Sequence, residues 1–361
     1  MNKNKLVLMI NRYLKFLLAP LAILYGLVVK VRNLLFDFKL LKSVSFQKHI
    51  ICVGNITVGG TGKTPHVEYL LKILSTNHKI ATLSRGYKRK TKEFRYVSTE
   101  SNASEVGDEP LQMKLKYPSV KIAVDANRVK GISRLIKDNP DLDAIILDDA
   151  YQHRWVKPGL LILLIDYNRL ITRDYFLPFG RLRDSVKEKR RAGIIIITKC
   201  PDNISELEMK GIQNELNPDV NQSVYFSTIS YGEPTPVFNE FNKKLVFTKE
   251  KEIFAFAGIA NPTFFYSFVK SKAKLMESHT FPDHFTFTRS KIYPIFDTYL
   301  KSSALNKAIV TTEKDAARLR EIELLDDEFK KALFYIPIEV KFLKDQENNF
   351  NKQILTYARK D

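Results

Sequence analysis

Residues that could bind phosphate stand together in the run Gly54-Asn55-Ile56-Thr57-Val58-Gly59-Gly60-Thr61-Gly62-Lys63-Thr64-Pro65. The apolar stretch 50–53 precedes the run and a helical pattern follows it to about Leu74, so a strand, a glycine-rich loop and a helix are expected. Lys63 would reach the β- and γ-phosphates of a nucleoside triphosphate, and the Thr64 hydroxyl would ligate Mg²⁺. The residues expected to bind the nucleotide are Gly59, Gly60, Thr61, Gly62, Lys63 and Thr64.

Thr57 departs from the usual phosphate-loop pattern, which has glycine at this position. Gly59 and Gly60 can supply the backbone freedom instead, because glycine turns its N–H groups toward a bound anion without steric cost. An ordinary glycine-rich turn is the alternative interpretation, and the flanking strand and helix disfavour it. We therefore expect a nucleotide site, and ask what receives the phosphate.

Two acidic residues, Asp148 and Asp149, end the apolar stretch 145–147. An acid at the end of a strand downstream of a phosphate loop holds Mg²⁺ directly or through the ligand shell of the loop hydroxyl. A solvated turn is the alternative, and the phosphate loop upstream disfavours it. The sequence thus predicts a metal-binding role for these carboxylates.

A second acidic pair, Asp108 and Glu109, stands near a predicted helix start. Such residues can simply favour the helix N-terminus electrostatically, or provide one metal ligand and one general base. His284 lies among aromatic residues in the run 281–285, where a packed core histidine is the simpler interpretation.

Basic residues follow two predicted strands, and they include Arg85 and Arg183. Because open α/β sheets bind ligands at the carboxyl ends of their strands, these residues could clamp an anionic substrate. The run Thr198-Lys199-Cys200-Pro201 resembles the base-reading motif of GTPases, but Pro201 stands where that motif has aspartate. Adenine is therefore the favoured base.

The charge of the chain is concentrated at its start. The net charge is +18, and residues 1–67 carry ten Lys or Arg against one acid, Asp37. The longest uncharged stretch there, 16–29, is shorter than the roughly 20 apolar residues that span a bilayer. A basic, apolar helix in the membrane interface fits this pattern, and a terminal helix buried on its own domain is the alternative. Neither stacking aromatic residues nor a known nucleic-acid-binding motif is found among these basic residues. We therefore expect no nucleic-acid partner.

The rest of the composition indicates a folded protein of 361 residues, with 44% hydrophobic and 27% charged residues. Cys52 and Cys200 stand in or beside apolar stretches without metal-ligand spacing, so we expect buried thiols. After residue 65, helical and apolar segments alternate, which predicts an α/β, P-loop NTPase-like, doubly wound and mostly parallel sheet. A smaller C-terminal α/β lobe and an N-terminal membrane-associated helix complete the expected fold. The expected boundaries are 1–45 for the N-terminal segment, 46–235 for the core domain and 236–361 for the smaller lobe.

Taken together, these segments resemble the tetraacyldisaccharide 4′-kinase family, the lipid A 4′-kinases of Gram-negative bacteria. Thr57 is expected in that family, which has Ser or Thr in this position of its loop. One departure is the run 178–184, which ends in Asp184 where the family usually has glutamate. The runs that carry the resemblance are 53–65, 83–87, 107–110, 147–153, 177–183, 257–262, 281–284 and 311–316.

The resemblance implies an active site between the two lobes. Asp108 would be the base for the sugar 4′-hydroxyl, oriented by His284, and Lys63 would act on the transferred phosphate. Glu109 and Asp149 would hold Mg²⁺, with Asp148 supporting the Thr64 shell. The residues implied to line the disaccharide and its phosphate are Arg85, Tyr87, Arg128, Gln152, His153 and Arg183.

We therefore expect an ATP- and Mg²⁺-dependent kinase that phosphorylates the 4′-hydroxyl of tetraacyldisaccharide 1-phosphate to form lipid IVA. Its partners would be the lipid substrate and the cytoplasmic face of the bacterial inner membrane, with no nucleic acid and no obligate protein partner. A membrane-associated P-loop NTPase that drives a protein partner is the alternative activity.

Overall fold

The computed structural model describes residues 17–241, 244–322 and 325–359. The chain divides into two compact units, each assembled from separate stretches of sequence. The first contains residues 1–85, 125–229 and 340–361, and the second contains 86–124 and 230–339. The linear segments 46–235 and 236–361 therefore each contribute to both units.

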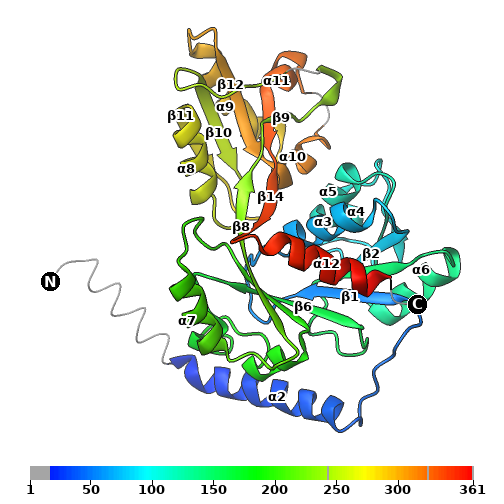
Figure 1. The fold of residues 1–361 in the computed structure, drawn as a ribbon. Helices are drawn as coiled ribbons and strands as arrows, with labels where there is room; N and C mark the ends of the chain where they lie inside the picture. The colour runs from blue at the N-terminus through cyan, green and yellow to red at the C-terminus, as the bar shows by residue number, and fades with distance from the viewer. Residues whose placement is uncertain (1–16, 242–243, 323–324, 360–361) are drawn as a thin grey trace. The chain divides into compact units, whose positions relative to one another are not determined.

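The first unit is built on a sheet whose strands follow the order β14-β8-β7-β6-β1-β5-β2 (Figure 1). The central pairs β1–β5, β1–β6, β2–β5, β6–β7 and β7–β8 are all parallel. The strands are β1 (His49–Gly54), β2 (Ile80–Ser84), β5 (Ala144–Asp148), β6 (Leu160–Asp166), β7 (Ile194–Thr198), β8 (Ser223–Tyr231) and β14 (Ile338–Phe342). The last residues of β8 and the first of β14 belong to the second unit.

The helices of the first unit are α2 (Ala19–Asp37), α3 (Lys63–Leu74), α6 (Arg128–Asp138), α7 (Glu206–Leu216) and α12 (Gln346–Ala358), with short 3₁₀ turns η1 (Ile171–Arg173) and η2 (Val186–Arg191). Helices α3, α6 and α7 lie between strands in the chain, which confirms the predicted alternation, whereas α2 precedes β1 and α12 follows β14. The basic stretch 183–191 forms no α-helix and contains only η2. Helix α7 fills a stretch for which no element was predicted.

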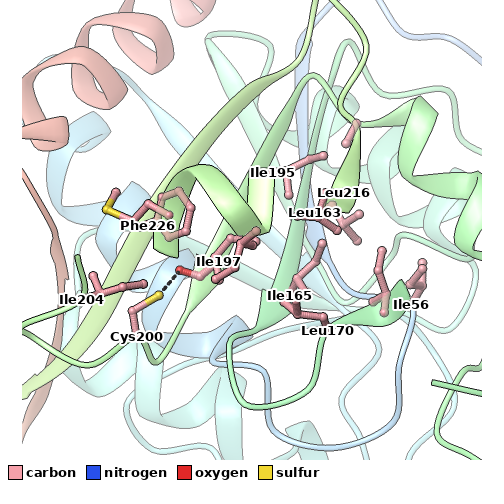
Figure 2. Packing of buried hydrophobic residues seen from close by; sticks show 14 of the residues in the cluster. Ile56, Leu163, Ile165, Leu170, Ile195, Ile197, Cys200, Ile204, Leu216 and Phe226 are labelled. Carbon is pink, nitrogen blue, oxygen red and sulfur yellow. Dashed lines mark hydrogen bonds between the residues drawn. The ribbon is translucent and has the colours of Figure 1, made fainter. Parts of the chain in front are cut away.

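The core of the first unit explains the continuous apolar strands. Ile195 and Ile197 on β7 pack with Leu163 and Ile165 on β6, with Phe226 on β8 beside them (Figure 2). All five side chains are essentially inaccessible to solvent, as expected for parallel strands covered on both faces. Both cysteines are buried and free, as the sequence predicted.

The second unit contains a smaller sheet in the order β11-β10-β12-β13-β9, parallel except for the β13–β9 pair. Alternate residues of its strands pack into two separate apolar clusters. The strands are β9 (Thr235–Pro236), β10 (Glu252–Ala257), β11 (Lys274–Thr280), β12 (Lys307–Thr312) and β13 (Leu333–Ile336), with a further antiparallel pair, β3 (Arg95–Tyr96) and β4 (Lys121–Val124). The helices are α4 (Ala103–Val106), α5 (Asp108–Lys116), α8 (Thr263–Lys272), α9 (Arg289–Lys301), α10 (Glu313–Leu319) and α11 (Asp327–Ala332), with the 3₁₀ turn η3 (Asn239–Phe241).

Helix α2 continues eight residues beyond the uncharged stretch 16–29 and ends at Asp37. It is the one helix of the described residues that is long and apolar enough to cross a membrane, judged by length and composition alone. A narrow stripe of α2 is buried, at Ala22, Gly26, Val29, Asn33 and Phe36. Most of its other apolar side chains are exposed, among them Ile23, Leu24, Leu27 and Val28. The helix therefore rests one face on the first unit and leaves an apolar face uncovered. The predicted basic residues of 1–16 lie outside the described residues.

Candidate active site

The phosphate loop joins β1 to α3 in the first unit, as the sequence predicted. Gly59 and Gly62 have φ angles of 110° and 84°, which side chains other than glycine rarely adopt. The side-chain amide of Asn55 donates a hydrogen bond of 2.8 Å to the Thr61 hydroxyl across the loop. Lys63 begins α3, so the positive end of a helix dipole and its free N–H groups adjoin the loop. This arrangement suits a bound anion.

Strand pairing brings the predicted metal-binding carboxylates beside the loop. Val53 on β1 is in register with Asp148 on β5, so Asp149 follows at the same sheet edge. Asp149 has a φ of 48°, an uncommon value outside glycine, and its Oδ2 lies 3.8 Å from the Lys63 Nζ. Burial raises the pKa of the Asp149 carboxyl, but the charges of Lys63 and Arg183 outweigh burial and lower it. The carboxylate is therefore ionised at neutral pH.

Arg183 also belongs to this cluster. Its backbone N–H donates to the carbonyl oxygen of Ile56 at 2.9 Å, which places the segment 181–184 alongside the phosphate loop. Its guanidinium pairs with the Asp149 carboxylate and donates to the side chain of Asn55. The Arg183 Nε is buried and has no hydrogen-bond partner among the described residues. That N–H is available to an oxygen of a bound phosphate.

The donor chemistry at this edge fits Mg²⁺. Thr64, Asp148 and Asp149 offer a hydroxyl and two carboxylates, and Mg²⁺ is usually held by one or two carboxylates together with phosphate oxygens and water. In the described ranges, no group of three or more His, Cys, Asp or Glu side chains is arranged to hold a metal ion. A metal at this edge would therefore depend on the nucleotide for part of its ligand shell.

Three of the residues implied to bind the disaccharide phosphate influence one another electrostatically. Arg128 is only 3% exposed, and burial lowers its pKa. Burial lowers the pKa of His153 to about 4, with further lowering by the charges of Arg128 and Arg85. The Arg128 Nε and the His153 Nε2 are buried and have no hydrogen-bond partner in the part of the chain that the structure describes. The neutral imidazole of His153 and the buried guanidinium of Arg128, each with an unused nitrogen, suit an anionic ligand. Gln152 donates from Nε2 to the backbone carbonyl of Asn55.

The second unit holds the predicted base. Asp108 is the first residue of α5, and its Oδ2 lies 2.7 Å from the Nδ1 of His284 and 2.6 Å from the Nη2 of Arg318. Burial raises the pKa of the Asp108 carboxyl, but the hydrogen bonds from His284 and Arg318 outweigh burial. The pKa therefore lies well below its usual range, and Asp108 is ionised at neutral pH.

Lys314 fixes the tautomer of His284. The Lys314 Nζ lies 3.2 Å from the His284 Nε2, so Nε2 accepts a hydrogen bond from the ammonium and Nδ1–H donates one to Asp108. Lys314 also pairs with Glu109 at 3.1 Å. His284 has a φ of 61°, and its ring lies 5.4 Å from the ring of Tyr87. A non-glycine residue held in the left-handed region is a recurrent feature of functional sites.

The predicted residues thus fall into two sets. The first unit contains Lys63, Thr64, Arg85, Arg128, Asp148, Asp149, Gln152, His153 and Arg183, together with Gly59, Gly60, Thr61 and Gly62. The second unit contains Tyr87, Asp108, Glu109 and His284. Within the first set, Lys63, Asp149 and Arg183 form one charged cluster; within the second, Asp108 contacts His284 and Glu109 contacts Lys314.

Three participating residues, Lys314, Arg318 and Lys199, were not predicted as site residues. Arg318 lies one turn after Lys314 on the same face of α10. The spacing of these two cations after Glu313 is the sequence signal that could have identified Arg318. Lys199 donates from Nζ to the backbone carbonyl of Gly60 and pairs with Asp166 at 2.8 Å. The run at 198–201 was considered only for base recognition, whereas its lysine contacts the phosphate loop.

Comparison with known proteins gives a consistent result. Residues 14–359 match the family model described as LpxK, tetraacyldisaccharide-1-P 4′-kinase. The tetraacyldisaccharide 4′-kinase of Bacteroides thetaiotaomicron is 44% identical over 354 residues, covering 95% of this chain and 93% of that protein. The protein of the same name from Flavobacterium johnsoniae is 42% identical, covering 96% and 98%. The crystal structure of LpxK from Aquifex aeolicus in complex with ATP has a TM-score of 0.71 and 26% identity, covering 96% of this chain and 99% of that one.

Proposed function

Because the chain belongs to the tetraacyldisaccharide-1-P 4′-kinase family, we propose that its first unit handles the phosphates of ATP and its second unit accepts the proton of the sugar hydroxyl. The family assigns the activity: a tetraacyldisaccharide 4′-kinase of lipid A biosynthesis, which phosphorylates the 4′-hydroxyl of a lipid disaccharide. This assignment decides against the alternative of a P-loop NTPase without a small-molecule acceptor.

The observation that carries the first half is the cluster of Lys63, Asp149 and Arg183 at the phosphate loop. Phosphoryl transfer passes through a loose transition state, so catalysis depends on positioning and on neutralising charge on the phosphate oxygens. Lys63 and Arg183 provide two cations for this purpose, and the LpxK structure with ATP supports ATP as the donor. Thr64, Asp148 and Asp149 would hold Mg²⁺, which would neutralise charge on the β- and γ-phosphates.

The second part of the proposal, acceptance of the proton from the sugar hydroxyl, rests on the Asp108 carboxylate. Its Oδ2 contacts both His284 and Arg318, while Oδ1 accepts no hydrogen bond from the described residues. We assign Oδ1 to the 4′-hydroxyl of the acceptor: the O–H bond breaks toward Asp108, the sugar oxygen bonds to the γ-phosphorus, and the bond to the β-phosphate oxygen breaks to release ADP. A carboxylate of low pKa suits a late proton transfer, because a loose transition state leaves the proton on the attacking oxygen until the new bond has largely formed. Glu109, which pairs with Lys314, would help to hold Mg²⁺.

The acceptor carries a phosphate of its own, and the buried nitrogens of Arg128, His153 and Arg183 suit that group or the ATP phosphates. Arg85, Tyr87 and Gln152 would complete the contacts to the disaccharide. Tyr87 is 61% exposed, and an aromatic ring offers a flat apolar surface to a sugar.

Because the acceptor is a lipid, the exposed apolar face of α2 has a function: it would bind the membrane that contains the acceptor. Leu17, Leu21, Ile23, Leu24 and Leu27 are each more than half exposed, an apolar patch that water disfavours. Lys30 follows these residues on α2, and Lys39 and Lys42 come just after the helix ends; cations beside an apolar helix suit the anionic cytoplasmic leaflet. We place α2 in the interface of that leaflet, as a peripheral or monotopic anchor, because its buried stripe keeps one side against the protein.

The test is phosphotransfer by the purified full chain. With ATP, Mg²⁺ and tetraacyldisaccharide 1-phosphate in phospholipid vesicles, radiolabel from the γ-phosphate is expected in the lipid product. An acceptor lacking the 4′-hydroxyl is the matched control and should remain unlabelled. Release of free phosphate at the same rate with and without acceptor would contradict the proposal. Lys63→Ala and Asp149→Asn should each abolish most of the transfer if the first-unit cluster acts on the phosphates.

A further inference from the structure

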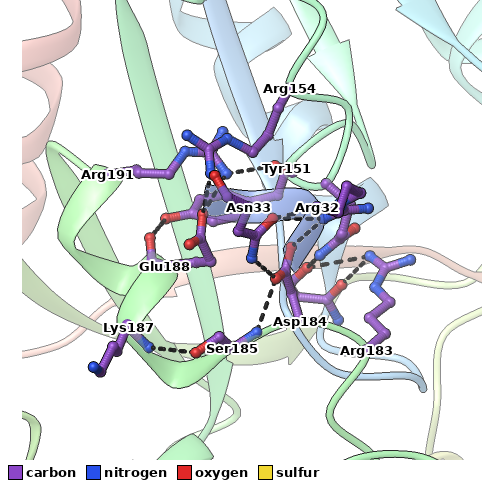
Figure 3. A network of polar contacts seen from close by, with 12 residues as sticks. Arg32, Asn33, Tyr151, Arg154, Arg183, Asp184, Ser185, Lys187, Glu188 and Arg191 are labelled. Atoms are coloured by element: carbon purple, nitrogen blue, oxygen red, sulfur yellow. Dashed lines mark hydrogen bonds and ion pairs between the residues drawn. The ribbon is translucent and has the colours of Figure 1, made fainter. Parts of the chain in front are cut away.

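The segment 183–185 contacts helix α2, where Asn33 and Arg32 face Asp184 (Figure 3), and it also contacts the phosphate loop. On the loop side, Arg183 bonds to Ile56 through its backbone and to Asp149 through its guanidinium. On the helix side, the Tyr25 hydroxyl donates to the backbone carbonyl of Arg183 at 3.0 Å. A displacement of α2 would therefore reach Arg183 through a single segment of chain.

Asp184 makes the strongest connection in this segment. Its side chain is 0% exposed, and its carboxylate accepts hydrogen bonds from Asn33 Nδ2 at 2.7 Å, Arg32 Nη2 at 3.1 Å and the backbone N–H of Ser185 at 2.8 Å. A buried carboxylate is costly unless such bonds satisfy it. Two of the three donors lie on α2, so the charge of Asp184 favours one position of the helix.

The polar side of α2 also reaches a second loop of the proposed site. Asn33 is 4% exposed on an otherwise apolar buried stripe. Arg154 donates from Nη1 to the carbonyl oxygen of Asn33 at 3.1 Å and from Nη2 to Asp37 at 2.6 Å. Arg154 directly follows Gln152 and His153. The helix thus bonds to both loops that carry proposed phosphate ligands, and attachment to a membrane requires neither bond.

We propose that Asp184 is a positioning residue: its bonds to Arg32 and Asn33 hold Arg183 in place at the phosphate loop, and α2 is part of the scaffold of the phosphate site. This inference rests on the proposed role of Arg183 at the phosphates. The inference gives α2 two separate roles. Its exposed apolar face contacts lipid, and the buried pair of Asn33 and Asp184 holds Arg183 at the phosphate loop. Loss of the pair should lower kcat without releasing the protein from membranes.

The first experiment measures kcat with vesicles that contain the lipid acceptor. Asp184→Asn should lower kcat by about 10- to 100-fold, because small displacements of a positioned group cost about this much. The double variant Asp184→Asn with Asn33→Asp exchanges the carboxylate and the amide, and should recover most of the loss. Lys210→Ala, which removes an exposed cation on α7 of the same unit, is the matched control and should leave kcat unchanged. All of these variants should pellet with vesicles as the parent protein does.

The second experiment distinguishes positioning from a general structural effect. In an Arg183→Ala background, Asp184→Asn should cause no further loss of kcat, because no guanidinium remains to be positioned. An equal fold-loss in both backgrounds would overturn the inference, as would a folded exchange variant without recovery. If Asp184→Asn does not fold, Arg32→Ala removes one donor from a partly exposed side chain and permits the same comparison. An unchanged kcat in Arg183→Ala alone would instead overturn the proposed function of Arg183, and this inference with it.

Discussion

Arg318 and Asp108 are joined by a hydrogen bond of 2.6 Å between Nη2 and Oδ2, across 210 residues of sequence. The same oxygen faces the Nδ1 of His284, so two donors share one carboxylate oxygen, and the other accepts no hydrogen bond from the residues that the structure describes. Arg318 is itself held by the buried carboxylate of Asp315 at 2.9 Å. The orientation of the proposed base is thus determined by α10 as much as by the histidine that the sequence singled out.

Asp108→Asn should lower kcat by about 10²- to 10⁴-fold and leave ATP affinity nearly unchanged, because the amide cannot accept a proton from the sugar hydroxyl. Steady-state phosphotransfer and equilibrium binding of ATP measure the two effects separately. Asp327→Asn is the control, since that side chain is 72% exposed in the same unit. Near-normal turnover of the Asp108 variant would remove this residue as the base.

Arg318→Gln should make activity more sensitive to acid. The guanidinium is one of the groups that hold the Asp108 pKa below its usual range, so its removal raises that pKa. Because the carboxylate must be ionised to accept the proton, the acid limb of kcat against pH should move to higher pH in the variant. Arg318→Lys keeps a cation and should show a smaller displacement. Superimposable profiles for the parent protein and the folded Gln variant would contradict this electrostatic role.

Sequence patterns predicted the parts of the site that are local. The phosphate loop lies within one strand–loop–helix connection, and Asp148 and Asp149 follow the neighbouring strand, so the parallel sheet itself brings them to the loop. Chain order also predicted the alternating elements of the first unit.

Other features depend on contacts between distant segments, for which a single sequence gives little signal. Asp184 bonds to α2 across about 150 residues of chain, and Lys199 reaches Gly60 across 139. Each unit is assembled from separate stretches, so no linker or change in composition marks where the chain passes between them. Helix α7 lies in a polar stretch whose apolar side chains, Met209, Ile212 and Leu216, are few but correctly spaced for one buried face.

His66 should make the protein less stable in mild acid. Burial lowers its pKa to about 4 from 6.5, with Nε2 facing the Ser227 hydroxyl at 3.0 Å. The folded state therefore binds fewer protons than the unfolded chain between these values, and stability is lost as pH falls from about 6.5 to about 4. The contribution is at most about 3 kcal/mol. Thermal unfolding at several pH values should show a shallower decline for His66→Gln; an identical decline would show that other groups are responsible.

The exposed face of α2 offers the last prediction. Leu24 and Val28 lie one turn apart and are 58% and 60% exposed, so replacing both with glutamate should barely affect folding. Two charges would oppose insertion into the interface of an anionic leaflet, and binding to vesicles should fall at least about tenfold, since each lost apolar side chain is worth about 1.5–3 kcal/mol when fully buried. Leu305→Glu, at an exposed leucine of the second unit, is the matched control and should bind vesicles normally. ATP binding should be unchanged in all three proteins, while transfer to an acceptor presented in vesicles should fall in proportion to the loss of binding. Full vesicle binding by the double variant would mean that a surface other than α2 attaches this kinase to its lipid substrate.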